Sequence, residues 1–302
     1  MAGRNGRTVR DLRRGNRTAV LQRLYFDGPM SRYELAHAYE TVNLLRDGGA
    51  ARIELNRPES LNAWNQQFGL DLKAAVEAVA GDEEVRAVVI TGAGRGFSSG
   101  ADLKGMGEGH PQTEEGQPDV RRVLTERYHP IIAGIRAMPK PVVAAVNGPA
   151  VGIGCSLALC CDLVAIRRSA YLMLAFVNIG LVPDGGSSVL IPARAGHARA
   201  FQMALLGDRV DADLAVEWGL ANWAWPDDEF DQRIDELVGR LATGPTRSYA
   251  GTKRQLNNRL YAGMDDQLEL EAEIQQEMVA SGDFVEGVTA FLEKRPARFA
   301  GD

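Results

Sequence analysis

One acidic residue lies between a proline and a pair of glycines in VNIGLVPDGGSS, residues 177–188. Proline and glycine favour a tight turn, so Asp184 is expected on a stiff bend rather than in a helix or strand. A carboxylate fixed in this way can take a proton from one atom of a substrate and return it to another. We therefore predict that Asp184 is a proton shuttle. The alternative is that Asp184 only caps a helix that begins near Gly186.

Two glycine loops could supply the electrostatic partner of this acid. The loop SSGAD, residues 98–102, follows a buried-strand pattern, and the loop GPAVGIGCS, residues 148–156, precedes an apolar helical pattern. Glycine lets the backbone approach a ligand closely, so one N–H group from each loop could point at the same oxygen atom. Two such donors form an oxyanion hole, which stabilises the negative charge that develops during a reaction.

The first loop also has features of a nucleotide-binding site. TGAGRGFSSGAD, residues 91–102, nearly matches the TGxxxGxG loop of short-chain dehydrogenases, and YAGTK, residues 249–253, supplies a YxxxK pattern. However, Ser98 stands where the last glycine belongs. No obvious helix follows the loop to receive a pyrophosphate at its N-terminus. A dinucleotide cofactor is therefore not expected.

The loops lie in a region where predicted strands alternate with predicted helices. Residues 39–58 alternate around an Asp-Gly-Gly turn and predict a β-hairpin, while residues 65–82 have helical periodicity. Three further apolar stretches predict buried strands: residues 85–94, 140–150 and 162–168. This order predicts an α/β core over residues 38–226, followed by a mostly helical region over residues 227–302.

The composition limits the class of protein. The 302 residues are 45% hydrophobic and 25% charged, which is ordinary for a globular protein. No stretch approaches the ~20 apolar residues of a membrane span, and the Arg-rich start lacks the apolar segment of a secretion signal. Cys155, Cys160 and Cys161 cluster in one apolar segment, which predicts core packing rather than a disulfide or a metal site. We therefore expect a cytoplasmic protein without a membrane partner.

The first 37 residues form a basic N-terminal extension that is expected to be non-catalytic. Residues 1–36 carry eight arginines against three acidic residues, a net charge of +5 in a chain whose total is −6. A short amphipathic stretch, a turn and the helix-start pattern SRYE, residues 31–34, resemble the beginning of the winged helix-turn-helix of ROK-type repressors. The resemblance ends at Ala36, before a recognition helix that could enter the DNA major groove. Nucleic-acid binding is therefore not expected.

Six motifs between residues 39 and 299 resemble, in order and spacing, the crotonase (enoyl-CoA hydratase/isomerase) superfamily. They are LNRPESLNAW, FSSGADLKGM, KPVVAAVNGPAVGIGCSLALCCDLVAI, IGLVPDGGSS, LLGDRVDADLAVEWGL and AFLEKRPARF. The resemblance implies an α/β fold, a spiral of ββα units, with a C-terminal helical region that builds trimers or hexamers. It also implies an acyl-CoA thioester as substrate, with coenzyme A as part of that substrate and with no separate cofactor or metal.

The resemblance also implies roles for individual residues. The N–H groups of Ala101 and Ile153 fall at the two oxyanion positions. Further positions match the groups that hold coenzyme A: Ser99, Leu103 and Lys104 near the adenine, residues 57–61 along the CoA chain, and Phe291 with Lys294, a pair that often acts from a neighbouring subunit. Asp102 is placed with these binding residues and is expected to accept hydrogen bonds from nearby backbone N–H groups.

Two departures from the family pattern bear on the reaction. Hydratases of this superfamily use two glutamates, and those positions are Ser156 and Phe176 here. Neither side chain can activate water as a base at neutral pH, so hydration is not expected, and Phe176 is expected to form an apolar wall. Asp184 stands where the isomerases place their catalytic acid. An enoyl-CoA isomerase is the best interpretation; a ring-epoxide isomerase of phenylacetyl-CoA type, a non-catalytic acyl-CoA binder and an acyl-CoA-sensing regulator remain alternatives.

Overall fold

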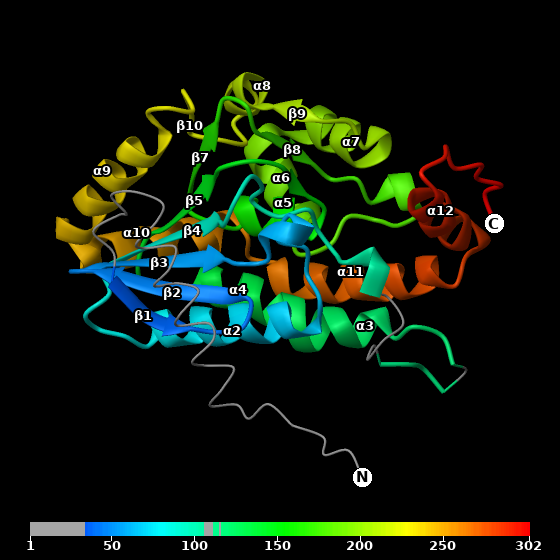
Figure 1. Ribbon diagram of the computed structural model, residues 1–302, viewed down its shortest axis with the longest axis horizontal. Helices are drawn as coiled ribbons and strands as arrows, with labels where there is room; N and C mark the ends of the chain where they lie inside the picture. The colour runs from blue at the N-terminus through cyan, green and yellow to red at the C-terminus, as the bar shows by residue number, and fades with distance from the viewer. Residues whose placement is uncertain (1–33, 106–110, 115) are drawn as a thin grey trace, which may run out of the picture.

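The computed structural model describes residues 34–105, 111–114 and 116–302, and a mixed β-sheet lies at its centre (Figure 1). Within the described residues this sheet has seven strands in the order β1-β2-β3-β4-β5-β7-β10. Their bounds are Glu34–Ala38, Val42–Asp47, Ala50–Leu55, Ala87–Gly92, Val142–Val146, Leu163–Arg167 and Trp223–Trp225. β1, β2 and β3 are antiparallel neighbours, whereas the strands from β3 to β10 run parallel. The predicted hairpin and the three predicted buried strands are confirmed.

Helices cover both faces of this sheet because its central strands are apolar on both sides. Every residue of β4 and β5 is buried, as in the middle strands of an α/β layer. α2 (Gln66–Ala80) and α4 (His129–Ala137) pack on one face, and α9 (Phe230–Thr243) packs on the other, at the left in Figure 1. The C-terminal helical region therefore begins as part of the same core rather than as a separate unit.

The loops that follow β4 and β5 are held side by side. These two strands are parallel neighbours, so the chain leaves both at the same edge of the sheet. An isolated bridge joins Ser98 to Ala150, and another joins Trp64 to Ala101. A second, three-stranded sheet continues from there with β6 (Ala150–Val151), β8 (Tyr171–Met173) and β9 (Val210–Asp211). The two glycine loops are thus fixed to one another by backbone pairing.

Every element described after Trp225 is a helix, as the sequence predicted. The other helices are α3 (Val120–Val123), α5 (Ile153–Leu159), α6 (Ser187–Ala195), α7 (His197–Leu206), α8 (Ala212–Glu217), α10 (Thr246–Leu260), α11 (Met264–Val279) and α12 (Gly282–Glu293). Four short turns are η1 (Pro58–Ser60), η2 (Leu103–Gly105), η3 (Leu124–Tyr128) and η4 (Val177–Ile179). α11 packs beside both α3 and α6 and so runs along the part of the core that follows the glycine loops.

The start of the described chain differs from the sequence prediction. SRYE was expected to open a helix, and residues 34–37 were assigned to the N-terminal extension. Instead, Glu34–Ala38 forms β1 and pairs with β2. β2 would otherwise be an edge strand with unpaired N–H and C=O groups, and pairing with β1 satisfies them. Residues 1–33, which carry the rest of the ROK-like stretch, lie outside the described residues.

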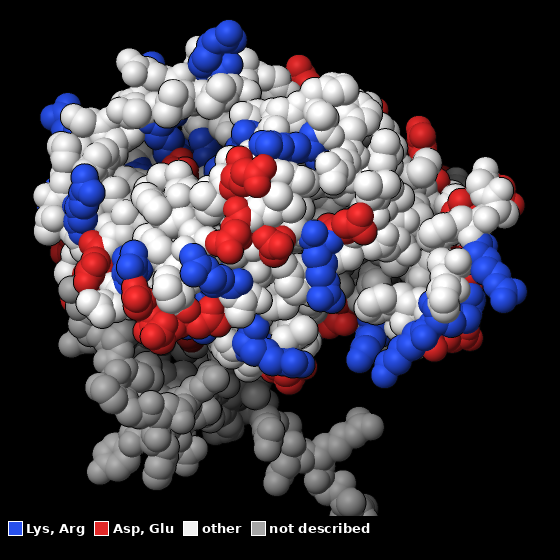
Figure 2. Space-filling view, turned by 90° about the horizontal axis from the view of Figure 1, so that it is seen from above, with Lys and Arg blue, Asp and Glu red and all other residues white. Residues whose placement is uncertain are grey.

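The three cysteines are buried and free, which confirms their predicted packing role. No helix in the described part of the chain is long and apolar enough to cross a membrane. Figure 2 shows basic and acidic side chains interspersed over the face seen from above, a mixed pattern unlike the basic stripe of a nucleic-acid interface on that face.

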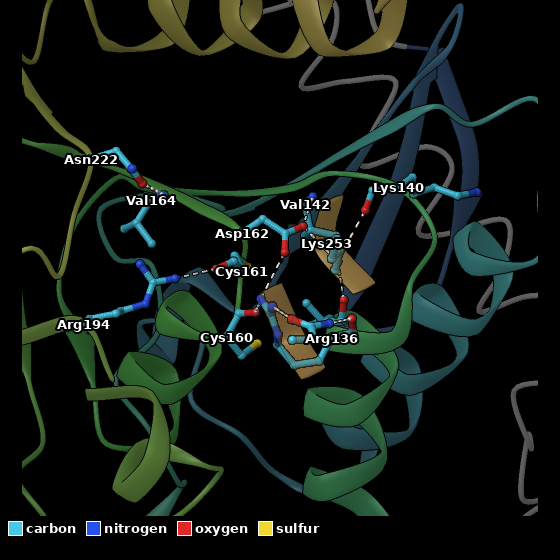
Figure 3. Close-up of polar contacts among 12 residues, drawn as sticks. Arg136, Lys140, Val142, Cys160, Cys161, Asp162, Val164, Arg194, Asn222 and Lys253 are labelled. Carbon is cyan, nitrogen blue, oxygen red and sulfur yellow. Dashed lines mark hydrogen bonds and ion pairs between the residues drawn. The ribbon is translucent and has the colours of Figure 1, made fainter. Parts of the chain in front are cut away.

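A buried ion network fixes the end of α5 against the sheet and α10 (Figure 3). The Asp162 carboxylate accepts hydrogen bonds from the Val142 N–H at 2.9 Å and from Arg136 at 3.0 Å, and it pairs with the Lys253 ammonium at 2.8 Å. Lys253 also donates to the carbonyl oxygen of Ile135 at 2.7 Å. Lys253, which completes the YxxxK pattern, therefore binds Asp162 and the end of α4.

Replacing Lys253 with methionine should destabilise the fold, because Asp162 would lose a buried partner of opposite charge. We expect K253M to lower the free energy of unfolding by roughly 3 kcal/mol. Urea denaturation followed by circular dichroism measures this change. R254M is the matched control, since the neighbouring Arg254 is exposed and its replacement should change stability by less than about 0.5 kcal/mol. Equal stabilities of the two variants would contradict the assignment.

Candidate active site

The two glycine loops touch at Gly100 and Gly152. A Cβ atom added to Gly100 would lie 2.9 Å from the carbonyl oxygen of Val151, and one added to Gly152 would lie 3.8 Å from the Gly100 Cα. Gly100 also has a φ of +91°, a conformation that residues with a side chain rarely adopt. The two loops can therefore lie this close only because glycine occupies the point of contact.

Two backbone N–H groups next to this contact have no acceptor among the described residues: those of Ala101 and Ile153. Pairing with Trp64 uses the carbonyl oxygen of Gly100 and the N–H of Asp102, which leaves the N–H of Ala101 between them unused. Ile153 is the first residue of α5, and the first N–H groups of a helix have no acceptor within the helix. Both predicted oxyanion donors are thus available to a ligand.

The turn that carries Asp184 packs against the second glycine loop. A Cβ atom on Gly185 would collide with the Cδ1 of Ile153 and would lie 3.0 Å from the Cβ of Ser156. Gly185 has a φ of +64°, so both the turn and the close approach require glycine. The structure therefore places the predicted acid directly beside the loop that carries one of the two free N–H groups.

The Asp184 carboxyl group is buried and only half satisfied. Asp184 is only 5% exposed. Oδ2 accepts a hydrogen bond from Gln275 Nε2 at 2.9 Å, whereas Oδ1 has no partner in the described part of the structure. The pKa of Asp184 is raised to about 7, mainly because the carboxyl group is buried. The hydrogen bond from Gln275 lowers this pKa, and the negative charge of Glu271 raises it. Asp184 can therefore both accept and release a proton near neutral pH.

The alternative role of Asp184 as a helix cap is wrong. α6 begins at Ser187, its N-cap is Gly186, and no side chain caps it. Asp184 contributes its main-chain carbonyl oxygen instead, which accepts hydrogen bonds from the hydroxyls of Ser187 and Ser156, both at 2.8 Å. Ser187 thus binds the main chain of Asp184, and the carboxylate is left free of any capping role.

Two residues that the sequence analysis missed hold this turn: Glu271 and Gln275, one helical turn apart on α11. Glu271 accepts hydrogen bonds from the Gly186 N–H at 2.7 Å and the Ser188 N–H at 3.0 Å. Gln275 binds Asp184 and also accepts a hydrogen bond from the Val182 N–H at 3.3 Å. Both side chains are almost fully buried. α11 thereby fixes the turn on both sides of the acid.

The two positions that differ from the hydratase pattern have other contacts. Ser156 is fully buried and uses its hydroxyl to hold the Asp184 carbonyl group. Phe176 is 7% exposed, and its Cζ atom would lie 3.9 Å from a Cβ on Gly152. An aromatic ring thus covers the second glycine loop, where it makes the surroundings of that loop apolar, as expected.

Comparison with known proteins agrees with this arrangement. The family model described as "Enoyl-CoA hydratase/isomerase" matches residues 46–302. The chain belongs to the enoyl-CoA hydratase/isomerase family. A solved structure described as an enoyl-CoA hydratase from Mycobacterium avium subsp. paratuberculosis K-10 is similar to this chain, with a TM-score of 0.79 and 39% sequence identity. The match covers 87% of this chain and 100% of that one. The predicted crotonase fold, a spiral of ββα units with a C-terminal helical region, is therefore confirmed.

Curated relatives within this family have different names. A "Probable enoyl-CoA hydratase" from Rhodobacter capsulatus is 42% identical over 264 residues, which cover 87% of this chain and 99% of the relative. A "1,2-epoxyphenylacetyl-CoA isomerase" from Escherichia coli is 39% identical over 254 residues, 84% of this chain and 95% of the relative. Family membership is therefore consistent with an acyl-CoA thioester substrate, but it does not determine the reaction.

The residues expected to hold coenzyme A in an enoyl-CoA hydratase/isomerase surround the first glycine loop. The Ser99 N–H donates to the carbonyl oxygen of Leu61 at 2.9 Å, and the Ser99 hydroxyl donates to the carbonyl oxygen of Ser60 at 3.0 Å. Ser99 therefore binds the end of the 57–61 segment. Leu103 and Lys104 lie in η2, directly after the loop, and Lys104 is exposed. Their contacts with coenzyme A remain expectations from the family.

The structure corrects the prediction for Asp102. Its carboxylate was expected to accept hydrogen bonds from nearby backbone N–H groups, but it forms an ion pair with Arg57 at 3.0 Å instead. The guanidinium of Arg57 reaches it because Arg57 also donates to the carbonyl oxygen of Ala63, which directs the side chain toward the loop. Asp102 thus joins the 57–61 segment to the first glycine loop.

Phe291 and Lys294 lie at the C-terminal end of α12 and are exposed, with 56% of Phe291 accessible. α12 packs against η4, the turn between Phe176 and Asp184, and Figure 1 shows it at the end of the molecule opposite α9. Within one chain these two family positions are therefore part of the surface.

The raised pKa of Asp184 predicts how the stability of this family member depends on pH. Between pH 4 and pH 7 the unfolded carboxyl group ionises while the folded one still keeps its proton, so wild-type stability falls as pH rises. D184N lacks this effect and should become more stable than the wild type, by roughly 1.4 kcal/mol per pH unit and at most about 4 kcal/mol above pH 7. Denaturant unfolding at pH 4, 6 and 8 measures the difference.

The control for this experiment is D265N, which removes an exposed carboxylate from α11. D265N should follow the wild type at every pH. A difference between D184N and the wild type that stays constant from pH 4 to pH 8 would show that Asp184 ionises normally.

Proposed function

We propose that this protein is an acyl-CoA isomerase that moves a carbon–carbon double bond through a thioester dienolate. The observation that supports this proposal best is the half-satisfied carboxyl group of Asp184, which is buried, has a pKa near 7 and keeps Oδ1 without a partner. It lies beside two touching loops whose N–H groups at Ala101 and Ile153 are unused. One acid and two donors are the parts that this reaction requires.

In the proposed reaction Asp184 moves the proton, and the two backbone N–H groups stabilise the charge on the thioester oxygen. Asp184 Oδ1 takes a proton from the carbon next to the thioester carbonyl of a 3-enoyl-CoA, and the electrons of that C–H bond form the dienolate. The N–H groups of Ala101 and Ile153 donate to the thioester oxygen, which now carries the negative charge; each such donor contributes about 3 kcal/mol in comparable sites. Asp184 then returns the proton to the fourth carbon, which leaves the double bond between the second and third.

Hydration fits these residues less well than isomerisation does. It requires a group that activates water and a group that delivers the proton, usually two carboxylates in this family. The two positions hold Ser156, whose hydroxyl is engaged with a carbonyl group, and Phe176, whose ring makes the surroundings apolar. An apolar surface next to Asp184 also keeps water from competing for its proton.

Replacing Asp184 with asparagine tests the proposal directly. D184N should bind acyl-CoA thioesters as the wild type does but convert 3-enoyl-CoA to 2-enoyl-CoA at least about 100-fold more slowly, because it cannot carry a proton. Ultraviolet absorbance of the conjugated product measures turnover, and calorimetry measures binding. D265N should retain wild-type activity. If wild type and D184N bind alike and neither turns over any enoyl-CoA, the protein is a binder and not an isomerase.

Gln275 should set the pH range of the reaction. Its hydrogen bond favours the ionised form of Asp184, so Q275L should raise the pKa of Asp184 further. The acidic limb of the profile of kcat/KM against pH then moves to higher pH, and a shift of one unit would lower activity at pH 6 about tenfold. Q276L is the control, because Gln276 binds Pro118 and the Arg121 N–H instead. An unchanged profile in Q275L would exclude this role.

A second candidate is the isomerisation of a ring epoxide of an aryl-acetyl-CoA. The 39% identity to a protein named 1,2-epoxyphenylacetyl-CoA isomerase favours it, and the aromatic wall at Phe176 is compatible with a ring. The protonated form of Asp184, which is present near pH 7, would supply the acid for ring opening. Offering a 3-enoyl-CoA and an aryl-epoxide thioester to the same preparation separates the two activities.

We further propose that the chain associates with copies of itself. Its C-terminal helices expose large apolar side chains, namely Leu256, Leu260, Leu270, Val285, Phe291 and Leu292. Exposed apolar surface of this kind is typical of association sites. In such an assembly Phe291 and Lys294 would contact the coenzyme A bound to a neighbouring copy.

A further inference from the structure

Tyr128 ends an unusual turn between α3 and α4. Residues 124–128 form a π-helical turn, in which the His129 N–H donates to the carbonyl oxygen of Leu124, five residues earlier. Pro130 follows and has no N–H, so it cannot form the ordinary helical bond to Glu126. The wider turn changes the direction in which Tyr128 points relative to a regular helix. Such turns occur frequently at functional sites.

The ring of Tyr128 is fixed beside the first glycine loop. It packs edge-on against Trp64, with ring centroids 4.9 Å apart and an interplanar angle of 77°. The Trp64 N–H donates to the carbonyl oxygen of Gly100 at 2.8 Å, and the Asp102 N–H donates back to Trp64 at 3.0 Å. On its other side, η3 contacts α11, the helix that holds Asp184. Tyr128 therefore lies between the loop that carries Ala101 and the helix that positions the acid.

The hydroxyl group of Tyr128 forms no hydrogen bond with any described residue, although the residue is only 8% exposed. Burial raises the pKa of Tyr128, and the negative charge of Asp184 raises it further. Arg127 lowers it by less and Asp102 adds the smallest effect, so the phenol stays protonated. The hydroxyl forms no hydrogen bond to the Oδ1 of Asp184, which has no partner in the described part of the structure.

Tyr128 and Asp184 each keep a side-chain oxygen atom without a hydrogen-bond partner among the described residues. The Oδ1 atom of Asp184 is sealed from solvent, whereas the hydroxyl of Tyr128 is not, so a ligand can reach the phenol. A donor that a ligand covers without giving it an acceptor is destabilising. Ala101 and Ile153 already offer donors for the thioester oxygen. The phenol is then available for a different acceptor, which must be carried by the acyl group close to the carbons that Asp184 serves.

We propose that Tyr128 contacts the acyl group and donates a hydrogen bond to an oxygen atom on it, so that the site selects oxygenated acyl-CoA thioesters over plain hydrocarbon ones. This inference rests on the proposed acyl-CoA site and narrows its substrate class to hydroxy-, oxo- or epoxy-acyl groups. A site whose hydrogen-bond donor is covered by the bound ligand discriminates strongly against the analogue that lacks the acceptor, because the donor is then left without a partner.

Binding to matched pairs of thioesters tests this selection without requiring turnover. The probes are butyryl-CoA against 3-hydroxybutyryl-CoA and 3-oxobutyryl-CoA, and phenylacetyl-CoA against 2-hydroxyphenylacetyl-CoA. In at least one pair the wild type should bind the oxygenated member about tenfold or more tightly, as measured by calorimetry. Y128F should bring that ratio close to one and leave affinity for the unoxygenated member within about twofold.

Two controls separate this role from a structural one. Y261F removes a phenolic hydroxyl at the end of α10 and should keep the wild-type ratio, and thermal unfolding checks that Y128F retains its fold. Equal loss of affinity for both members of every pair in Y128F would show that Tyr128 only packs, and would overturn the inference. A wild type that binds plain thioesters without preferring the oxygenated ones overturns the inference alone; a wild type that binds none of the five overturns the proposed function with it.

Discussion

The site depends on the burial of a single carboxyl group. Removing a carboxylate from water is costly, and the cost is reflected in a pKa near 7 for Asp184. One oxygen is bound by Gln275 and the other is left open, so the group is neither neutralised by an ion pair nor fully satisfied by hydrogen bonds. A group in this state is less stable than it would be in water, and the surrounding structure must hold it in place.

The elements around the turn supply that support from three directions. Ser156 and Ser187 bind the carbonyl group of Asp184, Glu271 binds the N–H groups that follow it, and the glycine at position 185 lets the turn lie against Ile153. α5, which carries Ser156, is anchored at its other end by the Asp162 network. The acid and the second glycine loop are therefore parts of one rigid arrangement, and preorganisation of this kind is what electrostatic catalysis requires.

The family and the reaction are determined at different levels of the structure. The parallel sheet and its two glycine loops belong to the fold that the chain shares with the enoyl-CoA hydratase/isomerase family. The reaction depends on the few side chains around the acyl group, and relatives of similar identity carry both hydratase and isomerase names. Identity to these relatives does not separate the two reactions, whereas the residues at positions 156, 176 and 184 bear on the choice.

The sequence by itself determined the hairpin, the buried strands, the apolar helix after the second loop and the position of Asp184 on a turn. These features follow from local signals: alternation, glycine and proline at turns, and apolar runs of strand or helix length. The glycine loops indicated that each could supply a free N–H group, and the resemblance to the crotonase superfamily indicated that these would be the N–H groups of Ala101 and Ile153.

Only the tertiary structure decided what surrounds the acid. Glu271 and Gln275 lie at helical spacing on the buried face of α11, whereas Glu273 and Glu277 are exposed. That spacing alone does not indicate that the two buried side chains bind the turn around Asp184. Arg57 and Asp102 are 45 residues apart, and their ion pair replaced the expected backbone contacts of Asp102. The pairing of β1 with β2 likewise overrode a helix-start signal. The first two outcomes depend on contacts between segments distant in the chain, and the third depends on pairing with the next strand. In each case the free energy of the contacts exceeds the weak local preferences that a sequence displays.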